Sequence, residues 1–279
     1  PGTDTGSPNG STGGGTNRSA SDLETVALGE ELTVGDVPVT ASDPAVRSAL
    51  VYRTDRKQYS LASSTGTHYL LVGVEGGADA PAPDQFRLVT ASSGTYRPST
   101  PTGGDPLDER GEAYAPADGT TSGWLAFTVP GGVPYSAAVL TTADAGTGWA
   151  LGEETVAAMA EPVPAFSLEG VEAPESVEAG SQFDVTVTVA NTSDTDGLAR
   201  GVVDQTAPST VAVPFSVDVA AGETGSYVEQ FFATSRASEV AFTVVTPGGD
   251  RSVSIPVEGG GEGENGTNGT NASGNASDE

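Results

Sequence analysis

The chain has 279 residues, with 38 acidic side chains against 11 basic ones and a formal net charge of −27. It has no cysteine and one histidine, His68, which excludes disulfide scaffolds, thiolate metal sites and multi-histidine metal sites. Because the charge repels phosphate groups, nucleic acids and anionic lipid surfaces are poor partners.

Two low-complexity ends enclose the regions that can fold. Residues 1–22 and 259–279 are rich in Gly, Ser, Thr and Asn and cannot bury enough apolar surface to offset their ordering entropy. The segment Glu161-Pro162-Val163-Pro164 carries two prolines, which favour an extended connector. We therefore expect a disordered tether at 1–22, one domain at 23–162, a second at 163–258 and a disordered tail at 259–279.

The first region reads as strands separated by turns. Strands are predicted at 33–40, 68–75, 85–90, 123–129 and 135–141. The segment HYLLVGVE (68–75) is apolar on both faces, which indicates a central strand. Residues 100–121, rich in Gly, Pro and acids, predict a long loop. Residues 152–160 fit either a short helix or a last strand, and the pattern leaves both open.

The second region has a clearer period-two pattern. In QFDVTVTVAN (182–191), Phe183, Val185, Val187 and Val189 fall on one face and polar side chains on the other. Further strands are predicted at 200–204, 211–219, 226–234, 240–246 and 251–257. Short strands between Gly/Pro turns, without any βαβ alternation, predict an all-β fold built as antiparallel sandwiches.

These residues resemble two known families. Residues 165–258 are similar to a CARDB (cell-adhesion-related) domain through Ala173-Pro174, Gly180, DVTVTVANTS, Gly197 and VDVAAGET. Residues 33–151 resemble the telokin-like lipoprotein domain of unknown function through VGDVPVT, THYLLVGVE, QFRLVTASSGTYRP and GWLAFTVPGG, although Gly76-Gly77 stand where that family usually has Asn. The resemblances imply two immunoglobulin-like antiparallel β-sandwiches in tandem and an extracytoplasmic setting. Neither family brings catalytic residues.

The acidic side chains are spread evenly. The net charge is −11 over residues 23–164 and −11 over residues 165–258, and Lys57 is the one lysine. In dilute buffer such a shell repels itself, whereas at ~1 M salt the Debye length falls to about 3 Å and the repulsion is screened. The composition is similar to that of proteins from extremely halophilic archaea. The alternative is an ordinary acidic secreted protein.

Every asparagine begins an Asn-x-Ser/Thr sequon. The seven are Asn9, Asn17, Asn191, Asn265, Asn268, Asn271 and Asn275. They predict an N-glycosylated surface protein; the alternative is low-complexity composition. The leader resembles the segment after the lipidated cysteine of exported lipoproteins, so we expect an anchor just before Pro1 that holds the protein at the outer face of the cytoplasmic membrane. The alternative is a freely secreted or wall-bound protein.

Candidate chemistry is sparse. The sequence has no Gly-x-Ser-x-Gly nucleophile motif for which His68 could act as the general base. His68 is therefore expected to be a strand-end histidine satisfied by a neighbour. Asp194-Thr195-Asp196-Gly197 resembles the start of a calcium loop but lacks the remaining ligands, so a turn is expected. The acids Asp105, Asp108, Glu109 and Glu112 are expected in a solvated loop, with weak cation binding as the alternative. No catalytic residue, metal or cofactor is expected.

One basic cluster stands out against the acidic background. Arg53, Arg56 and Lys57 lie in VYRTDRKQY, which could dock an acidic protein or a glycan; the alternative is internal pairing with Asp55. We expect a non-enzymatic adhesion, scaffold or interaction protein whose partners are other surface proteins or glycans. The alternative is a ligand-binding accessory lipoprotein of a transporter or a polymer-processing complex, for which Trp124 and Trp149 would line a pocket. The oligomeric state is left open.

Overall fold

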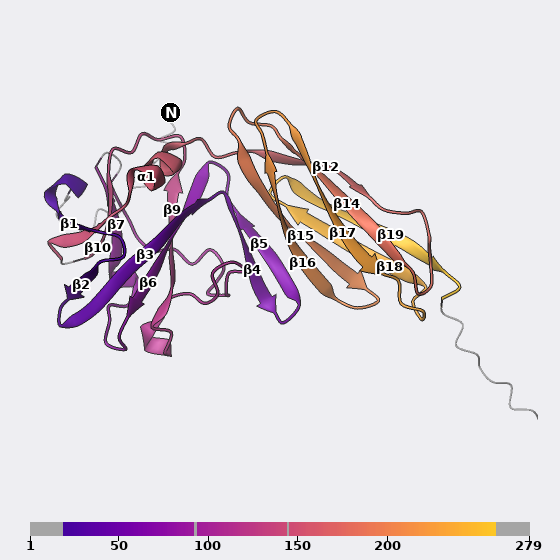
Figure 1. Cartoon of the computed structure of the whole chain (residues 1–279), viewed down its shortest axis with the longest axis horizontal. Coiled ribbons are helices and arrows are strands. Elements are labelled where there is room, and N and C mark those ends of the chain that lie inside the picture. Colours follow the sequence, from indigo (N-terminus) through magenta and orange to yellow (C-terminus); the bar gives the residue numbers. More distant parts are fainter. Residues whose placement is uncertain (1–18, 92–93, 144, 261–279) are drawn as a thin grey trace, which may run out of the picture.

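A computed structural model describes residues 19–91, 94–143 and 145–260. Over these residues the chain is built mainly of β-strands, with one α-helix, so the predicted all-β class is confirmed (Figure 1). Most of the predicted tether, most of the predicted tail and six of the seven sequons lie outside the described residues.

Two sheets form the N-terminal half. Their strand orders are β1-β11-β10-β7-β8 and β2-β3-β6-β9. The strands are β1 (Glu24–Ala27), β2 (Glu31–Val34), β3 (Val37–Arg47), β6 (Thr67–Gly76), β7 (Phe86–Thr90), β8 (Gly94–Tyr96), β9 (Ser122–Pro130), β10 (Ala138–Thr142) and β11 (Thr147–Ala150). A separate hairpin is made of β4 (Ala49–Asp55) and β5 (Gln58–Ser63), and the helices are η1 (Ala20–Asp22), η2 (Pro83–Gln85), η3 (Pro116–Asp118) and α1 (Glu153–Ala160).

Strand β6 is apolar on both faces because both faces are covered. Leu70 and Val72 pack into the main core, together with Leu88 and Leu140 from the opposite sheet. The alternate side chains of β6 belong to a second cluster, which also contains residues of β4, β9 and the 100–121 loop. The strand lies inside its sheet, between β3 and β9, as its apolar pattern predicts.

Two local predictions need correction, and a third segment takes one of the two forms that its pattern left open. The single strand expected at 33–40 is a hairpin of β2 and β3 that reverses at Gly35, where φ is +65°. The strand expected at 135–141 begins only at Ala138. Residues 153–160 form helix α1, which buries Val156 and Met159 and places two glutamates in its first turn, where they favour the helix dipole.

The C-terminal half also has two sheets. Their orders are β12-β14-β17 and β13-β19-β18-β15-β16. The strands are β12 (Phe166–Glu172), β13 (Val177–Glu178), β14 (Gln182–Asn191), β15 (Gly197–Ala207), β16 (Val211–Val219), β17 (Thr224–Phe232), β18 (Glu239–Thr246) and β19 (Gly249–Glu258). Strands β14 and β16 have the predicted bounds, whereas β15 is longer than expected and β12 and β13 were not predicted.

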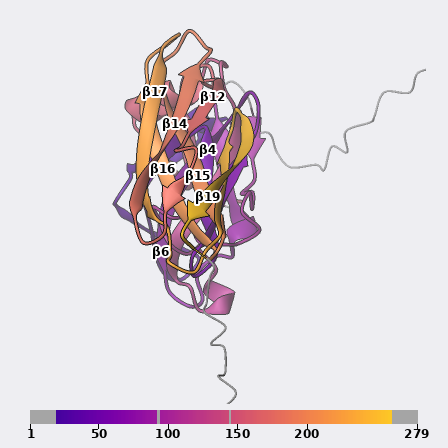
Figure 2. The same cartoon turned by 90° about the vertical axis from the view of Figure 1, so that its right-hand side faces the viewer.

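The core of this half lies between its two sheets, and this half faces the viewer in Figure 2. Every second residue of β14 from Phe183 to Val189 is buried, as the period-two pattern predicts. Phe183, Phe231 and Phe242 form an aromatic cluster, in which the rings of Phe231 and Phe242 have centroids 4.5 Å apart. Aromatic pairs of this kind stabilise beyond the area they bury.

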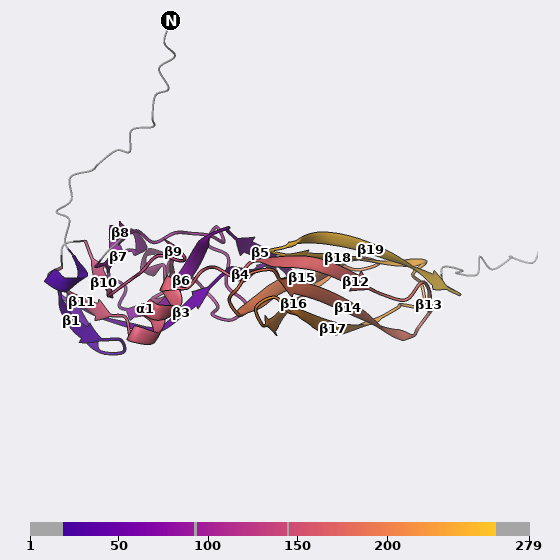
Figure 3. The ribbon, with the colours of Figure 1, turned by 90° about the horizontal axis from the view of Figure 1, so that it is seen from above.

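The two halves lie end to end, with hairpin β4–β5 between them (Figure 3). The connector Glu161-Pro162-Val163-Pro164 has no helix or strand, in agreement with the extended form expected from its prolines. Within the described residues, no helix has the length and apolar character that a membrane span requires.

Candidate functional site

The hairpin β4–β5 presents a different apolar surface on each face. Because side chains alternate along a strand, Leu50 and Tyr52 pack with the outer cluster of the N-terminal half. On the other face, Val51 packs with Val202 and Ala212 of the C-terminal half. The partly buried side chains of β5 that join this second cluster are Tyr59 and Leu61. The hairpin therefore belongs by sequence to one half and packs against both.

Main-chain hydrogen bonds fix the hairpin on each side. The N–H of Ala212 in β16 donates to the carbonyl of Lys57, at 2.8 Å. The 100–121 loop runs along the other edge, where the N–H of Arg53 donates to the carbonyl of Pro106 at 2.9 Å and the N–H of Asp108 donates to the carbonyl of Val51 at 3.1 Å. This pairing holds the next loop residue, Glu109, at the junction of the two halves.

Glu109 joins two arginines from different halves. Its Oε1 lies 2.7 Å from Nη2 of Arg200 on β15, and its Oε2 lies 3.6 Å from Nη2 of Arg47 at the end of β3. The Arg200 side chain is 7% exposed, while that of Glu109 is 45% exposed. Burial raises the pKa of Glu109, but the hydrogen bond and charge of Arg200, and then those of Arg47, outweigh it and lower the pKa below its ordinary value.

The alternation of β15 explains why a buried arginine points out of its own core. Ala199 and Val203 pack into the C-terminal core, so Arg200 and Val202 face the junction. Asp204, two residues after Val202, lies on the same face of β15. One of its carboxylate oxygens is buried with no hydrogen-bond partner, and burial raises the pKa of Asp204.

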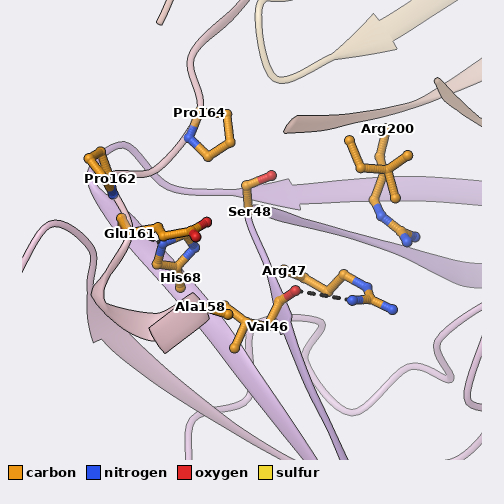
Figure 4. A pocket seen from close by; sticks show the side chains of 10 residues that line it. Val46, Arg47, Ser48, His68, Ala158, Glu161, Pro162, Pro164 and Arg200 are labelled. Atoms are coloured by element: carbon orange, nitrogen blue, oxygen red, sulfur yellow. Dashed lines mark hydrogen bonds between the residues drawn. The ribbon is translucent and has the colours of Figure 1, made fainter. Parts of the chain in front are cut away.

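A pocket of about 150 Å³ opens at this junction (Figure 4). Its walls come from the end of β3, the start of β6, the connector and β15. His68 is 5% exposed, and its Nε2 lies 2.9 Å from the carbonyl oxygen of Glu161, so Nε2 carries the hydrogen and donates. The expected strand-end histidine satisfied by a neighbour is found for Nε2, whereas Nδ1 is buried without a hydrogen-bond partner.

Gly131 permits the connector to approach His68. A Cβ at Gly131 would lie 2.5 Å from Val163 and 3.0 Å from the imidazole ring. The N–H of the following residue, Gly132, donates to the carbonyl of Glu161 at 2.9 Å. The connector is thus fastened to the N-terminal half just before the chain enters the C-terminal half.

The predicted basic cluster lies at the tip of the hairpin, with Arg53 near the end of β4 and Arg56 and Lys57 in the turn. The side chains of Arg53, Arg56 and Lys57 are exposed, and no ion pair joins them to any carboxylate that the structure describes. The alternative of side-chain pairing with Asp55 is not what is found, because Oδ1 of Asp55 accepts from the backbone N–H of Arg56 at 2.6 Å.

Asn191 is the one sequon asparagine within the described residues, and it is 1% exposed. Its Nδ2 donates to the carbonyls of Thr195 at 2.7 Å and Val219 at 3.0 Å, and its Oδ1 accepts from the N–H and hydroxyl of Ser193. A glycosyltransferase could not reach this amide in the folded chain. We therefore expect Asn191 to be unmodified, despite its sequon.

The other candidates take structural positions. Trp124 and Trp149 are buried, and their Nε1 atoms donate to the carbonyls of Gly111 and Glu30, each at 2.8 Å. Of the loop acids, Glu109 contacts arginines. In the 194–197 segment, Oδ1 of Asp196 accepts from the N–H of Ala221 at 2.9 Å. Over the described ranges, no group of three or more His, Asp or Glu side chains could hold a metal ion.

No sequence motif marks the junction itself. Arg47, Glu109 and Arg200 are distant in the chain, and none belongs to a recognisable motif. One local signal was present: in GLARGVVD (197–204), at the start of β15, Arg200 interrupts a run of residues that are buried on both faces. A charged side chain in such a run indicates a partner outside the strand's own sheet.

No family model and no curated protein matches the sequence. Among solved structures, a β-glucosidase from Listeria innocua is 16% identical, with 35% of this chain and 16% of that chain covered and a TM-score of 0.30. A β-glucosidase from Bifidobacterium adolescentis is 19% identical, with 34% and 18% covered and a TM-score of 0.28. An alkylpurine DNA glycosylase from Pseudomonas fluorescens is 13% identical, with 37% and 32% covered and a TM-score of 0.27. Similarities this weak and partial carry no argument about function.

Proposed function

We propose that the chain is a non-enzymatic extracellular scaffold, in which two immunoglobulin-like sandwiches in tandem display a basic hairpin turn to a partner at high salt. The observation that carries the proposal is the junction. Hairpin β4–β5 packs on both halves, and Glu109 contacts an arginine from each. The domains would correspond to residues 23–162 and 163–258.

A scaffold benefits from a junction that resists bending. An interface between domains held by one flexible linker allows relative motion by default. Here an apolar cluster, a main-chain hydrogen bond from Ala212 and the contacts of Glu109 all oppose such motion. The terminal segments, with their six sequons, would connect this body to the cell surface and keep it hydrated.

The hairpin turn is the contact site that we propose. The backbone of Lys57 is engaged within the molecule, while its side chain and those of Arg53 and Arg56 are exposed. A small positive patch on a chain of net charge −27 would bind an acidic surface protein or an anionic glycan, and it would orient that partner relative to both halves. In molar salt only short-range contacts survive screening, so the partner must dock closely.

The ligand-binding accessory lipoprotein remains the alternative, and it has less support. It would need exposed aromatic side chains around a pocket, and the two tryptophans are buried.

The proposal is tested by capture from a surface extract in ~3 M KCl, with three baits. They are the wild-type chain, a variant with Arg53, Arg56 and Lys57 reversed to Glu, and a control with the exposed Arg97, Arg236 and Arg251 reversed to Glu. Bound proteins are identified by mass spectrometry and bound glycans by monosaccharide analysis. We expect one partner to bind the wild type and the control but not the hairpin variant. Equal capture by all three baits would remove the hairpin from the proposal, and turnover of a surface glycan or peptide by the wild type would overturn the non-enzymatic assignment.

A further inference from the structure

The junction pocket contains polar groups that the protein itself leaves unsatisfied. Nε of Arg47, Nε of Arg200 and Nδ1 of His68 are all buried and have no hydrogen-bond partner. All three residues line the same pocket, the two arginines toward one end and His68 toward the other (Figure 4). A buried donor without an acceptor is costly, and the cost is larger when the donor belongs to a charged group.

The two guanidinium groups need more negative charge than Glu109 supplies. Nη2 of each arginine faces that one carboxylate, and Nη1 of Arg47 donates to the carbonyl of Val46 at 3.0 Å. Burial, followed by the positive charge of Arg200, lowers the pKa of Arg47, and Arg110 adds a third positive charge nearby. Glu161 lines the opposite end of the pocket, beside His68, and is an exposed residue (Figure 4).

The volume limits what can enter. A pocket of about 150 Å³ holds a small anion with a few waters and excludes a nucleotide or an oligosaccharide. Arginine Nε–H groups only donate, so they require an acceptor. His68 donates through Nε2, so in its neutral form Nδ1 must accept, and a water that donates to Nδ1 can donate its second hydrogen to an anion.

We propose that the pocket binds one small hydrated anion, a halide or a short carboxylate, between the Nε–H groups of Arg47 and Arg200. The hydroxyl of Ser48, which lies between the two ends of the pocket, would donate a third hydrogen bond (Figure 4). Arg47 comes from the N-terminal half and Arg200 from the C-terminal half, so the anion bridges the two. It adds to Glu109 a second negative group between the same arginines.

The direct test is anomalous diffraction from crystals of the full chain soaked in bromide. We expect a bromide peak between the guanidinium groups of Arg47 and Arg200. Density for water alone at that position, with no anomalous signal, would overturn the proposal.

The solution test measures the excess ³⁵Cl line width that the protein causes. Arg47→Lys with Arg200→Lys keeps both positive charges beside Glu109 but removes both Nε–H donors. It should lower the excess width by more than half, while Arg97→Lys with Arg236→Lys, at exposed arginines, should leave it unchanged. If the double junction variant does not fold, Arg47→Lys alone serves, because the Arg47–Glu109 contact is the longer of the two. Equal widths in the wild type and the junction variants would refute the site. Competition by acetate would identify a carboxylate, and resistance to acetate would identify a halide.

Discussion

The sharpest consequence of the junction concerns Glu109. Glu109→Gln keeps the size of the side chain and one acceptor for Arg200 but removes the charge that faces both arginines. Breaking a fully buried ion pair costs about 3–5 kcal/mol, while exposed pairs contribute about 0–1 kcal/mol. Because the Arg200 side chain is 7% exposed and that of Glu109 45% exposed, we expect an intermediate loss of about 1–2 kcal/mol.

Thermal unfolding at pH 7 in ~3 M KCl measures this loss. For a chain of this size, 1 kcal/mol shifts Tm by about 2–4 °C, so Glu109→Gln should lower Tm by roughly 2–8 °C. Glu112→Gln is the matched control, since it removes the same charge from an exposed position of the same loop. Its effect should stay within about 0.5 kcal/mol. If the two variants melt together, Glu109 does not join the halves as its distances suggest.

Acidification, loss of a buried amide and a change of salt should each alter the stability of the protein. Because the folded protein lowers the pKa of Glu109 from 4.5, the contribution of Glu109 to the free energy of unfolding is complete above about pH 4.5 and is lost as the pH falls through the folded-state pKa. The difference in unfolding free energy between wild type and Glu109→Gln should therefore vanish on acidification. A difference that stays constant would contradict this. Asn191→Ala should lower the free energy of unfolding in urea by about 2–4 kcal/mol, because two carbonyls and a hydroxyl lose their hydrogen-bond partners. Glycopeptide mapping of the native protein should find no glycan on Asn191. A glycan there would show that the amide becomes exposed. Unfolding midpoints should rise from ~0.1 M to ~3 M KCl as the −27 charge is screened, and equal midpoints would refute adaptation to high salt.

Local patterns were sufficient where one strand faces one core. The alternation in 182–191 predicts β14 with its bounds because Phe183 to Val189 all pack into the same cluster. The segment VYRTDRKQY has no such pattern, since Val51 and Tyr52 pack against different halves and the charged residues lie at the tip of the hairpin. A strand whose two faces pack against different halves does not show the period-two alternation of a strand that has one buried and one exposed face.

The junction could not be predicted for a different reason. Arg47, Glu109 and Arg200 meet only after a loop pairs with a hairpin, and each step depends on contacts between distant residues. The sequon at Asn191 illustrates the same limit: the motif is local, but the burial of the amide is decided by the carbonyl of Val219, 28 residues away.

The position of hairpin β4–β5 also restricts how the protein can be rearranged by evolution. Residues 163–258, transplanted into another protein, would leave Val202 and Ala212 uncovered, because Val51 and its neighbours come from the other half. An insertion in the connector would separate Val163 from Gly131 and pull the hairpin away from β16. We therefore expect the two halves to be inherited as a pair with a connector of fixed length, and changes at Val51 to be matched by changes at Val202 or Ala212.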